Sequence, residues 1–384
     1  MQLHHSVAAL SETCRTLRRA LHQIPEIGFD LYETSAFLRT RLEALEPDRL
    51  ESFAGTGLRA VFLADGATET IAFRADMDAL NLREENDFPY VSCHEGRMHG
   101  CGHDGHMTIL LLLAELLACH RRDLKANIVL LFQPGEEGYG GAKRMIAEGA
   151  LENPHADRIY GLHVWPTVPK GKIGVRLGVM MASTTEFDVI VHGRTAHGAS
   201  PQMGVDAVVA AAELITLLQT AITRHLDPHE DALLTFGRIS GGSARNVIAD
   251  RVELNGTLRV NSMAVYAKLQ ECIHHMADGL AVATGARFEL VKHMQYPCVD
   301  NPRPMVEEFY THFDMRDMFL TEPVMAAEDF ACYQAERPGL FLFLGTQDET
   351  HTQPLHNGRF DFDEDVLLLG VEVFARLAGL ADVL

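Results

Sequence analysis

Three apolar runs of the chain are each followed by residues with acidic or metal-binding side chains. The runs are residues 70–74, 127–132 and 158–162. Their hydrophobic residues alternate or are continuous, which is typical of buried strands. The side chains that follow them are, in order, those of Asp78, Glu136, Glu137 and His163. Because helical crossovers bring the carboxyl ends of parallel strands to one edge of a sheet, we expect these side chains to converge there.

The length and composition of the chain fit an α/β protein of two domains. It has 384 residues, of which 47% are hydrophobic and only 7% aromatic, so its core is expected to be mainly aliphatic. Residues 8–22 and 32–46 have the pattern of amphipathic helices that precede the first strand. The formal net charge of −20 argues against nucleic acid as a partner, because phosphates require a basic surface.

The cysteines and the apolar stretches indicate a cytoplasmic protein with no membrane segment. The seven cysteines are scattered and odd in number, whereas a disulfide framework normally shows an even count. The N-terminal residues lack the apolar core of a signal peptide. The longest apolar run, residues 109–119, is shorter than the roughly 18 residues that a membrane span needs, and it contains Glu115.

The order of predicted elements changes near Ser183. From there the pattern predicts a strand, a helix, two strands, a helix and a strand, which is the βαββαβ order of a ferredoxin-like unit. These elements are predicted at residues 184–192, 205–224, 232–239, 251–260, 265–284 and 287–293. We therefore expect a catalytic domain at residues 1–182 and 296–384, with a compact domain inserted at residues 183–295.

Residues 98–107, MHGCGHDGHM, contain Cys101, His103 and His106 within six positions. A thiolate and imidazoles are preferred ligands of zinc and similar ions. An apolar run of helical character follows, so the group lies at the entrance to a helix, where a metal site can be open to substrate. Histidine is frequent in this chain, with 20 residues, so a structural role for these side chains is the alternative.

The adjacent residues Glu136 and Glu137 allow a division of roles. Neighbouring side chains in extended or turning backbone point in different directions, so one carboxylate can bind a metal while the other faces a metal-bound water. A metal lowers the pKa of water from about 15.7 to roughly 7, and a carboxylate can then accept its proton. The alternative is a solvated acidic pair on a glycine-rich turn.

Other polar residues are candidates for substrate binding. His197 lies among small residues, in a loop that can approach a ligand closely. Asn246 can donate a hydrogen bond to a substrate carbonyl or carboxylate. Arg259 can pair with a carboxylate through two hydrogen bonds, although a surface arginine on a strand fits this position equally well. Taken singly, His163 and His356 fit a structural or solvated role.

The order of the motifs along nearly the whole chain resembles that of one enzyme family. The motifs are RADMDAL, MHGCGHDGH, FQPGEEGYGGAKRMI, GLHVWP, GRTAHGASPQMGVDAV, GGSARNVIAD, AAEDF and LHNGRFDFDED. They are similar to those of the amidohydrolase branch of the aminoacylase/carboxypeptidase-like metallopeptidases. This branch includes hippurate hydrolases, N-acyl-amino-acid amidohydrolases, N-acetyldiaminopimelate deacetylases and auxin-conjugate hydrolases. The resemblance is specific for fold and reaction type and much less so for substrate.

The resemblance implies a mixed, mostly parallel sheet with flanking helices and a site for two divalent ions, together with an inserted ferredoxin-like lid and dimerisation domain. The implied metal ligands are Cys101, His103, Glu137, His163 and His356. Glu136 is then the general base and later the proton donor, while His197 stabilises the oxyanion in this or the neighbouring subunit. Asp78 and Asp104 are expected behind the ligands, where they orient them. Asn246 is implied to bind substrate.

Three positions depart from the pattern of this branch. The smallest departure is Gly100, which stands where alanine is usual in the CGHDGH motif. Asn81 stands where the branch usually has proline, which alters the loop after RADMDAL. Asp76 stands where distant members have a metal-binding histidine, so Asp76 is not expected to be a ligand, and Cys101 takes part instead.

We therefore expect a metal-dependent hydrolase that cleaves the amide bond of N-acyl amino acids, of the N-acetyl or N-benzoyl type. The expected cofactors are two divalent ions, zinc or manganese, and the same ligands accept cobalt or nickel. The expected partners are a small-molecule substrate and further copies of the chain, in a homodimer or homotetramer formed through the inserted domain. The alternatives are a dipeptidase or aminopeptidase of the same superfamily and a non-catalytic, metal-containing binding protein.

Overall fold

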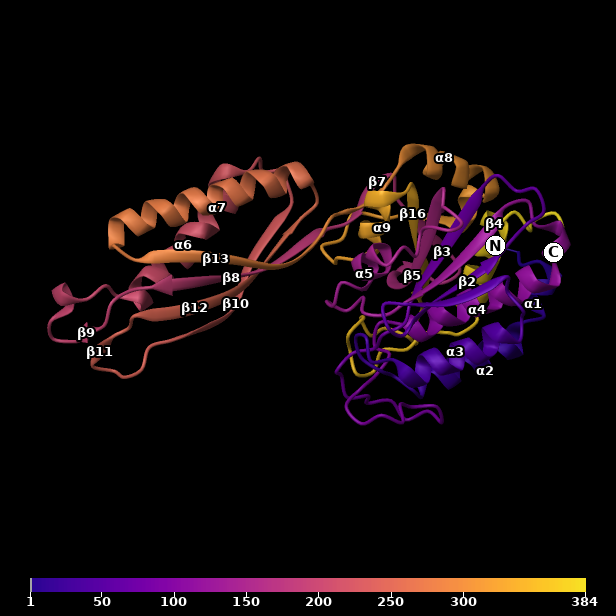
Figure 1. Cartoon of the computed structure of the whole chain (residues 1–384), viewed down its shortest axis with the longest axis horizontal. Helices are drawn as coiled ribbons and strands as arrows, with labels where there is room; N and C mark the ends of the chain where they lie inside the picture. Colours follow the sequence, from indigo (N-terminus) through magenta and orange to yellow (C-terminus); the bar gives the residue numbers. More distant parts are fainter. Residues whose placement is uncertain (1) are drawn as a thin grey trace. The chain divides into compact units, whose positions relative to one another are not determined.

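The chain forms two compact units in the computed structural model, which describes residues 2–384 (Figure 1). The larger unit comprises the chain up to Met180, with Asp300–Glu322 and Asp329–Leu384. The smaller unit comprises Met181–Val299 and Pro323–Glu328. It contains the whole of the predicted insertion, residues 183–295, and also a short C-terminal segment that the sequence pattern assigns to the first domain.

An eight-stranded mixed sheet forms the centre of the larger unit. Its order is β1-β2-β4-β3-β5-β16-β6-β15, and β4, β3, β5 and β16 run parallel. The strands are β1 Arg49–Phe53, β2 Gly57–Phe62, β3 Thr70–Asp76, β4 Asn127–Gln133, β5 Arg158–Pro169, β6 Ile173–Val175, β15 Met318–Leu320 and β16 Gly339–Gln347. Two further short strands, β7 Gly178–Met181 and β14 Val299–Asn301, pair separately. This mixed, mostly parallel sheet with helices around it confirms the predicted fold class.

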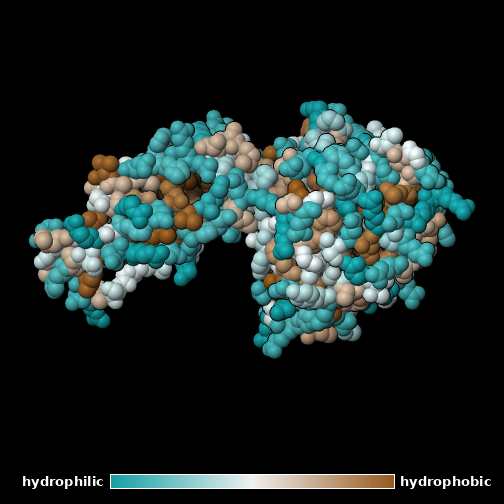
Figure 2. All heavy atoms as spheres, viewed as in Figure 1, coloured by the Kyte–Doolittle hydropathy of each residue, from teal (hydrophilic) through white to brown (hydrophobic). Residues whose placement is uncertain are grey.

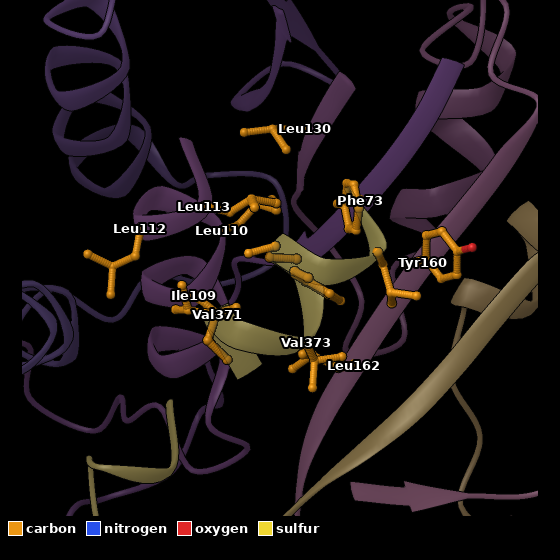
Figure 3. Close-up of a cluster of buried hydrophobic side chains, with 14 of the residues drawn as sticks. Phe73, Ile109, Leu110, Leu112, Leu113, Leu130, Tyr160, Leu162, Val371 and Val373 are labelled. Atoms are coloured by element: carbon orange, nitrogen blue, oxygen red, sulfur yellow. The ribbon is translucent and has the colours of Figure 1, made fainter. Parts of the chain in front are cut away.

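Helices flank the sheet and bury its apolar residues. They are α1 His5–Ala8, α2 Ser11–His22, α3 Tyr32–Glu43, α4 His103–Cys119, α5 Gly141–Ala147, α8 Arg303–His312, α9 Phe330–Glu336 and α10 Val366–Leu377. Figure 3 shows side chains of α4 and α10, among them Ile109 and Val371, gathered with Phe73 and Leu130 of the sheet. Almost every residue of helix α4 is buried, so its apolar side chains pack on several sides and not along one face only.

The predicted elements of the larger unit are present, with one error at a strand end. The helices predicted at residues 8–22 and 32–46 are α2 and α3. The third predicted strand does not end at His163, because β5 continues to Pro169. The reason is that Val164 and Trp165 still pair with β16, which supplies backbone partners beyond the local apolar run. His163 therefore lies within a strand.

The smaller unit has the predicted βαββαβ order. Its elements are β8 Ser183–His192, α6 Ala207–His225, β10 Ala232–Gly241, β12 Arg251–Val260, α7 Met263–Thr284 and β13 Arg287–Tyr296. The strands form an antiparallel sheet of order β10-β12-β8-β13. Asp206 caps α6, since its carboxylate accepts hydrogen bonds from the N–H groups of Val208 and Val209. Alternate residues of β12 are buried against the helices, as the period of two requires.

Helix α6 is the one helix among the described residues that is long and apolar enough to cross a membrane, judged by length and composition alone. A core helix passes the same test. Ala210, Leu214 and Leu218 of α6 are buried in the core of the smaller unit, so its apolar character has a structural explanation.

Candidate metal centre

The implied ligands come from four separate segments of the larger unit. His103 is the first residue of α4 and Cys101 lies just before it, Glu137 is in the turn after β4, His163 in β5 and His356 in the loop before α10. The structure brings all five together in two overlapping groups. Within each group, the donor atoms lie within 4.8 Å of one another. One group is Cys101, His103 and His163, and the other is Cys101, Glu137 and His356.

The closest approaches among these donors are compatible with shared ions. Cys101 Sγ lies 3.3 Å from His163 Nε2. Glu137 Oε1 lies 3.4 Å from His356 Nε2 and 3.9 Å from His103 Nε2. Cys101 belongs to both groups and Glu137 reaches two histidines, so the five donors form one continuous cluster.

Two buried atoms of this cluster have no hydrogen-bond partner among residues 2–384. They are His103 Nε2 and Glu137 Oε1. Such a group costs about 1–3 kcal/mol when it is left unsatisfied, and a bound cation removes that cost. The chemistry of the donors, one thiol, three imidazoles and a carboxylate, also fits divalent zinc or manganese. The residues present therefore fit the metal site that the resemblance implies.

Two of the histidines are held in the orientation of metal ligands. His103 Nδ1 lies 2.7 Å from the carbonyl oxygen of Asp78, and His163 Nδ1 lies 2.6 Å from that of Val164. A carbonyl can only accept, so each Nδ1 carries the proton and donates it. Each ring therefore leaves its Nε2 lone pair free for a metal.

The surroundings of Cys101 and His163 set their protonation. Burial, together with the charges of Glu137 and Glu136, raises the pKa of the Cys101 thiol well above its usual value. Burial also lowers the pKa of His163 well below its usual value, so its imidazole is neutral, as a ligand must be. A cation bound here would offset the charge of the carboxylates and favour the thiolate form of Cys101.

Two backbone positions near the cluster have left-handed conformations. His356 has φ 62°, which is uncommon for a residue other than glycine and marks a position held by its surroundings. Its N–H donates to the carbonyl oxygen of Gly100 at 2.8 Å, next to Cys101. Gly102 has φ 85°, and a Cβ there would lie 2.3 Å from Val164 Cγ2. Only glycine fits between α4 and β5 at this position.

Asp78 holds both glutamates through their backbone. Its carboxylate accepts hydrogen bonds from the N–H of Glu136 at 2.9 Å and from that of Glu137 at 3.2 Å. Carboxylate oxygens of both glutamates lie within 4.8 Å of a ring nitrogen of His103, and Glu136 is 8% exposed. Asp78 thus fixes the turn that places the Glu137 carboxylate among the implied ligands and the Glu136 carboxylate next to them.

Two further residues of the 98–107 segment have their polar atoms bonded to groups other than the five implied ligands. His106 Nδ1 lies 2.6 Å from Asp76 Oδ1, and His106 Nε2 accepts a hydrogen bond from the Val164 N–H at 2.9 Å. Both ring nitrogens are therefore in use. Asp104 bonds to Arg18 Nε at 2.9 Å and to His22 Nδ1 at 2.7 Å, so it fixes the first turn of α4 from behind.

Sequence reasoning missed a buried network centred on Arg74. Its guanidinium donates to Asp76 at 2.7 Å, to Asp329 at 2.8 Å and to Gln133 at 2.9 Å. The signal was present in the sequence, because an arginine inside an apolar strand is almost never buried unless it is paired. Its partner Asp329 lies in the AAEDF motif, 255 residues further along the chain.

The remaining predicted residues lie in the smaller unit. His197 and Asn246 are both exposed and come together, because β9 (Ala196–His197) pairs with β11 (Val247–Ile248) and Gly198 N–H donates to the Asn246 carbonyl at 2.8 Å. Arg259 donates to the carbonyl oxygen of Met325 at 2.7 Å. Arg259 thus has a structural contact within its own unit.

The α/β fold and a cluster of thiol, imidazole and carboxylate donors beside a further glutamate define the class of metal-dependent hydrolases. Comparison with known proteins agrees. The chain belongs to peptidase family M20/M25/M40, whose profile matches residues 72–379. This membership confirms the predicted family and makes the chain a hydrolase of amide bonds.

Among the chain's relatives are enzymes of bacteria and plants. The N-acetyldiaminopimelate deacetylase of Bacillus pumilus is 35% identical over 95% of this chain and 98% of its own length. The IAA-amino acid hydrolase ILR1-like 2 of Arabidopsis thaliana is 36% identical over 94% of this chain and 83% of its own length. A dinuclear metal binding peptidase from the M20 family of Bacillus subtilis has a crystal structure that matches with a TM-score of 0.84 and 30% identity, over 97% and 98% of the two chains. These likenesses support divalent metal ions as cofactors.

Proposed function

We propose that the chain hydrolyses the amide bond of N-acyl amino acids, releasing a carboxylic acid and a free amino acid. The observation that carries this proposal is the position of Glu136 beside five convergent donors, with Glu136 N–H held by Asp78. Two relatives support the substrate class, since one is named for deacetylation of an N-acetyl amino acid and the other for hydrolysis of an amino acid conjugate.

The chemistry divides between the cofactors and the residues of the chain. Cys101, His103, Glu137, His163 and His356 would hold two divalent ions, zinc or manganese, which supply an acidified water and a Lewis acid for the amide carbonyl. Glu136 accepts a proton from the attacking water and then gives it to the leaving nitrogen. Asp78 fixes the backbone of Glu136 and Glu137, so that their two carboxylates can have these separate roles.

The smaller unit supplies groups for the substrate in this proposal. His197 donates a hydrogen bond to the oxyanion, a contribution that is typically worth 10²–10³-fold in rate. Asn246, which is tied to the His197 loop, binds the substrate, and Arg259 remains a candidate for its carboxylate. A homodimer or homotetramer formed through this unit would allow His197 to act in a neighbouring subunit.

A cavity of about 320 Å³ in the larger unit adjoins the ligands Glu137 and His356. Its other lining residues include Ile27, Leu80 and Tyr139, and no lysine or arginine lines it. This size is that of a small-molecule site. An uncharged acyl group fits such a surface, whereas the amino-acid carboxylate requires a cation elsewhere. Asn81, the departure from the usual proline, also lines this cavity and so bears on acyl selectivity.

A metal-reconstitution assay tests the proposed function. The purified protein is stripped with a chelator, reloaded with zinc or manganese, and offered N-acetyl, N-benzoyl and indoleacetyl amino acids beside a set of dipeptides. Metal-dependent release of free amino acid from the acyl substrates is expected. Cleavage of dipeptides alone would instead assign the chain to the exopeptidases, and metal binding without any turnover would favour the binding protein.

A further inference from the structure

The loop between β4 and α5, residues 134–140, is closed at its two ends. It carries both glutamates of the metal centre and is called the glutamate loop below. Gly141 N–H donates to the carbonyl oxygen of Gly135 at 2.9 Å, and a Cβ on Gly141 would lie 1.7 Å from the carbonyl oxygen of Pro134. Only glycine allows so close an approach. A group that holds this closing point therefore also fixes where the two glutamates lie.

The carboxylate of Asp329 joins the two ends of the glutamate loop. It accepts hydrogen bonds from the side-chain amide of Gln133 at 2.8 Å, at the end of β4, and from the Ala142 N–H at 2.9 Å, in the first turn of α5. Arg74 donates to the side-chain oxygen of Gln133 at 2.9 Å, so the NH2 group of that amide faces Asp329. Helix α9, which begins after Asp329, contacts α5 (Figure 1).

This carboxylate is fully buried and does not cap its own helix. Asp329 is 0% exposed, whereas the face of the larger unit in Figure 2 is largely hydrophilic, and a carboxylate there would be solvated. Asp329 occupies the N-cap position of α9, where an aspartate usually accepts a hydrogen bond from its helix, but its side chain makes no such bond. A buried carboxylate is unfavourable unless it is paired and hydrogen-bonded. Arg74, which donates at 2.8 Å, and the two loop ends account for its burial.

We propose that Asp329 is a positioning residue for Glu136. A carboxylate oxygen of Asp329 lies within 4.8 Å of one of Glu136, so the loop is held close to the proposed base. Asp78 holds the middle of the glutamate loop through the N–H groups of Glu136 and Glu137, and Asp329 holds its ends. Misplacing a catalytic group by about 1 Å can cost roughly 10²-fold in rate. The assignment rests on the proposed function, because it requires Glu136 to be the base.

The substitution Asp329→Asn tests the proposal in the metal-loaded protein. The amide oxygen is held by the charged Arg74, so the NH2 group faces the Ala142 N–H, where two donors meet and the hydrogen bond is lost. We expect kcat on an N-acyl amino acid to fall about tenfold or more, with KM within about threefold and metal content unchanged. Hydrogen exchange of the loop amides should become about tenfold faster. A folded variant with wild-type kcat and wild-type exchange would overturn the proposal.

Leu38→Ala is the control for a loss of stability alone. Leu38 is a fully buried core residue of α3, so its truncation destabilises the larger unit without removing a hydrogen bond of the glutamate loop. Measured well below the unfolding temperature, its kcat and loop exchange should stay within about twofold of wild type. An equal fall in kcat in Leu38→Ala and Asp329→Asn would reduce Asp329 to a general stabilising residue and contradict the assignment.

A second variant, Ala142→Pro, keeps the test decisive if Asp329→Asn does not fold. It removes the N–H that Asp329 binds at the α5 end, in the first turn, where a helix tolerates proline. The same fall in kcat at unchanged metal content is expected, and a wild-type kcat would refute the proposal. If the wild-type protein turns over no acyl substrate, the proposed function fails, and the exchange rates of Asp329→Asn still show whether Asp329 holds the loop.

Discussion

His106 and Asp76 form a short buried hydrogen bond, with 2.6 Å between Nδ1 and Oδ1. Asp76 is in turn paired with Arg74, and His106 Nε2 accepts the Val164 N–H. This chain of contacts links β3, α4 and β5 directly behind His103 and His163. It explains why His106, although part of the densest histidine segment, is a support for the candidate ligands.

Replacing Asp76 with asparagine should destabilise the larger unit strongly. The substitution leaves the buried Arg74 without one of its two carboxylates, and breaking a buried ion pair costs about 3–5 kcal/mol. Urea unfolding measures the loss. The control is Asp65→Asn, at an exposed position, which should change the free energy of unfolding by less than about 0.5 kcal/mol. Equal unfolding midpoints for the two variants would contradict the role of Asp76.

Glu136→Gln should abolish most turnover while metal stays bound. The amide cannot accept the proton of water, so we expect a loss of about 10²–10⁴-fold in kcat. The matched variant is Glu137→Gln, one residue further on, which should lower metal content as well as activity. Elemental analysis and kinetics on the same samples separate the two roles. Substantial activity in Glu136→Gln would remove Glu136 from the position of base.

Cys101→Ser should weaken metal binding, since a neutral hydroxyl is a poor substitute for a thiolate. The ring of Trp165, the chain's single tryptophan, lies edge-on to that of His163, with 5.7 Å between the ring centroids. The fluorescence of Trp165 can therefore report metal binding at this site. Cys14→Ser is the control. Cys14 is a buried core residue of α2, and burial raises the pKa of its thiol to about 12. Its replacement should lower stability without changing metal affinity. Identical zinc titrations for wild type and Cys101→Ser would exclude Cys101 as a ligand.

The contribution of His22 to stability should fall as pH rises. Burial alone would lower the pKa of His22, but its hydrogen bonds to Asp104 at 2.7 Å and Glu84 at 2.9 Å outweigh burial and raise it. A pKa that is higher in the folded than in the unfolded state means that the stabilisation is complete below about pH 6.5. It is lost as pH rises through the raised value.

The measurement for His22 is the gap in unfolding free energy between wild type and His22→Gln across this pH range. We expect the gap to be widest below about pH 6.5 and to narrow as pH increases. A gap that stays constant or widens toward alkaline pH would show that His22 is neutral in the folded protein.

His197→Ala should be rescued in mixed oligomers if His197 serves a neighbouring subunit. Each of His197→Ala and Glu136→Gln is expected to be inactive alone, but a hybrid contains one intact combination of His197 and Glu136. Activity of the mixture is measured after subunit exchange has been verified with differently tagged chains. Exchange without any recovery would place the action of His197 within its own subunit.

Local sequence determined most of the secondary structure of this protein and marked its candidate metal ligands. The period of the apolar residues predicted β3, β4 and the βαββαβ unit, because alternation and helical spacing are properties of neighbouring residues. The spacing of Cys101 and His103, and the adjacency of Glu136 and Glu137, marked candidate metal chemistry. Parallel strand order then explained why residues so far apart in sequence could converge.

Only the tertiary structure decided which polar groups pair with one another. Arg74 meets Asp329 across 255 positions, and Asp104 turns to Arg18 and His22 on α2, behind α4. Likewise, β5 runs on past His163 because β16 offers it backbone partners. No local pattern encodes such choices, since a buried charge or an unpaired strand end takes whatever partner the packed fold brings within hydrogen-bond distance.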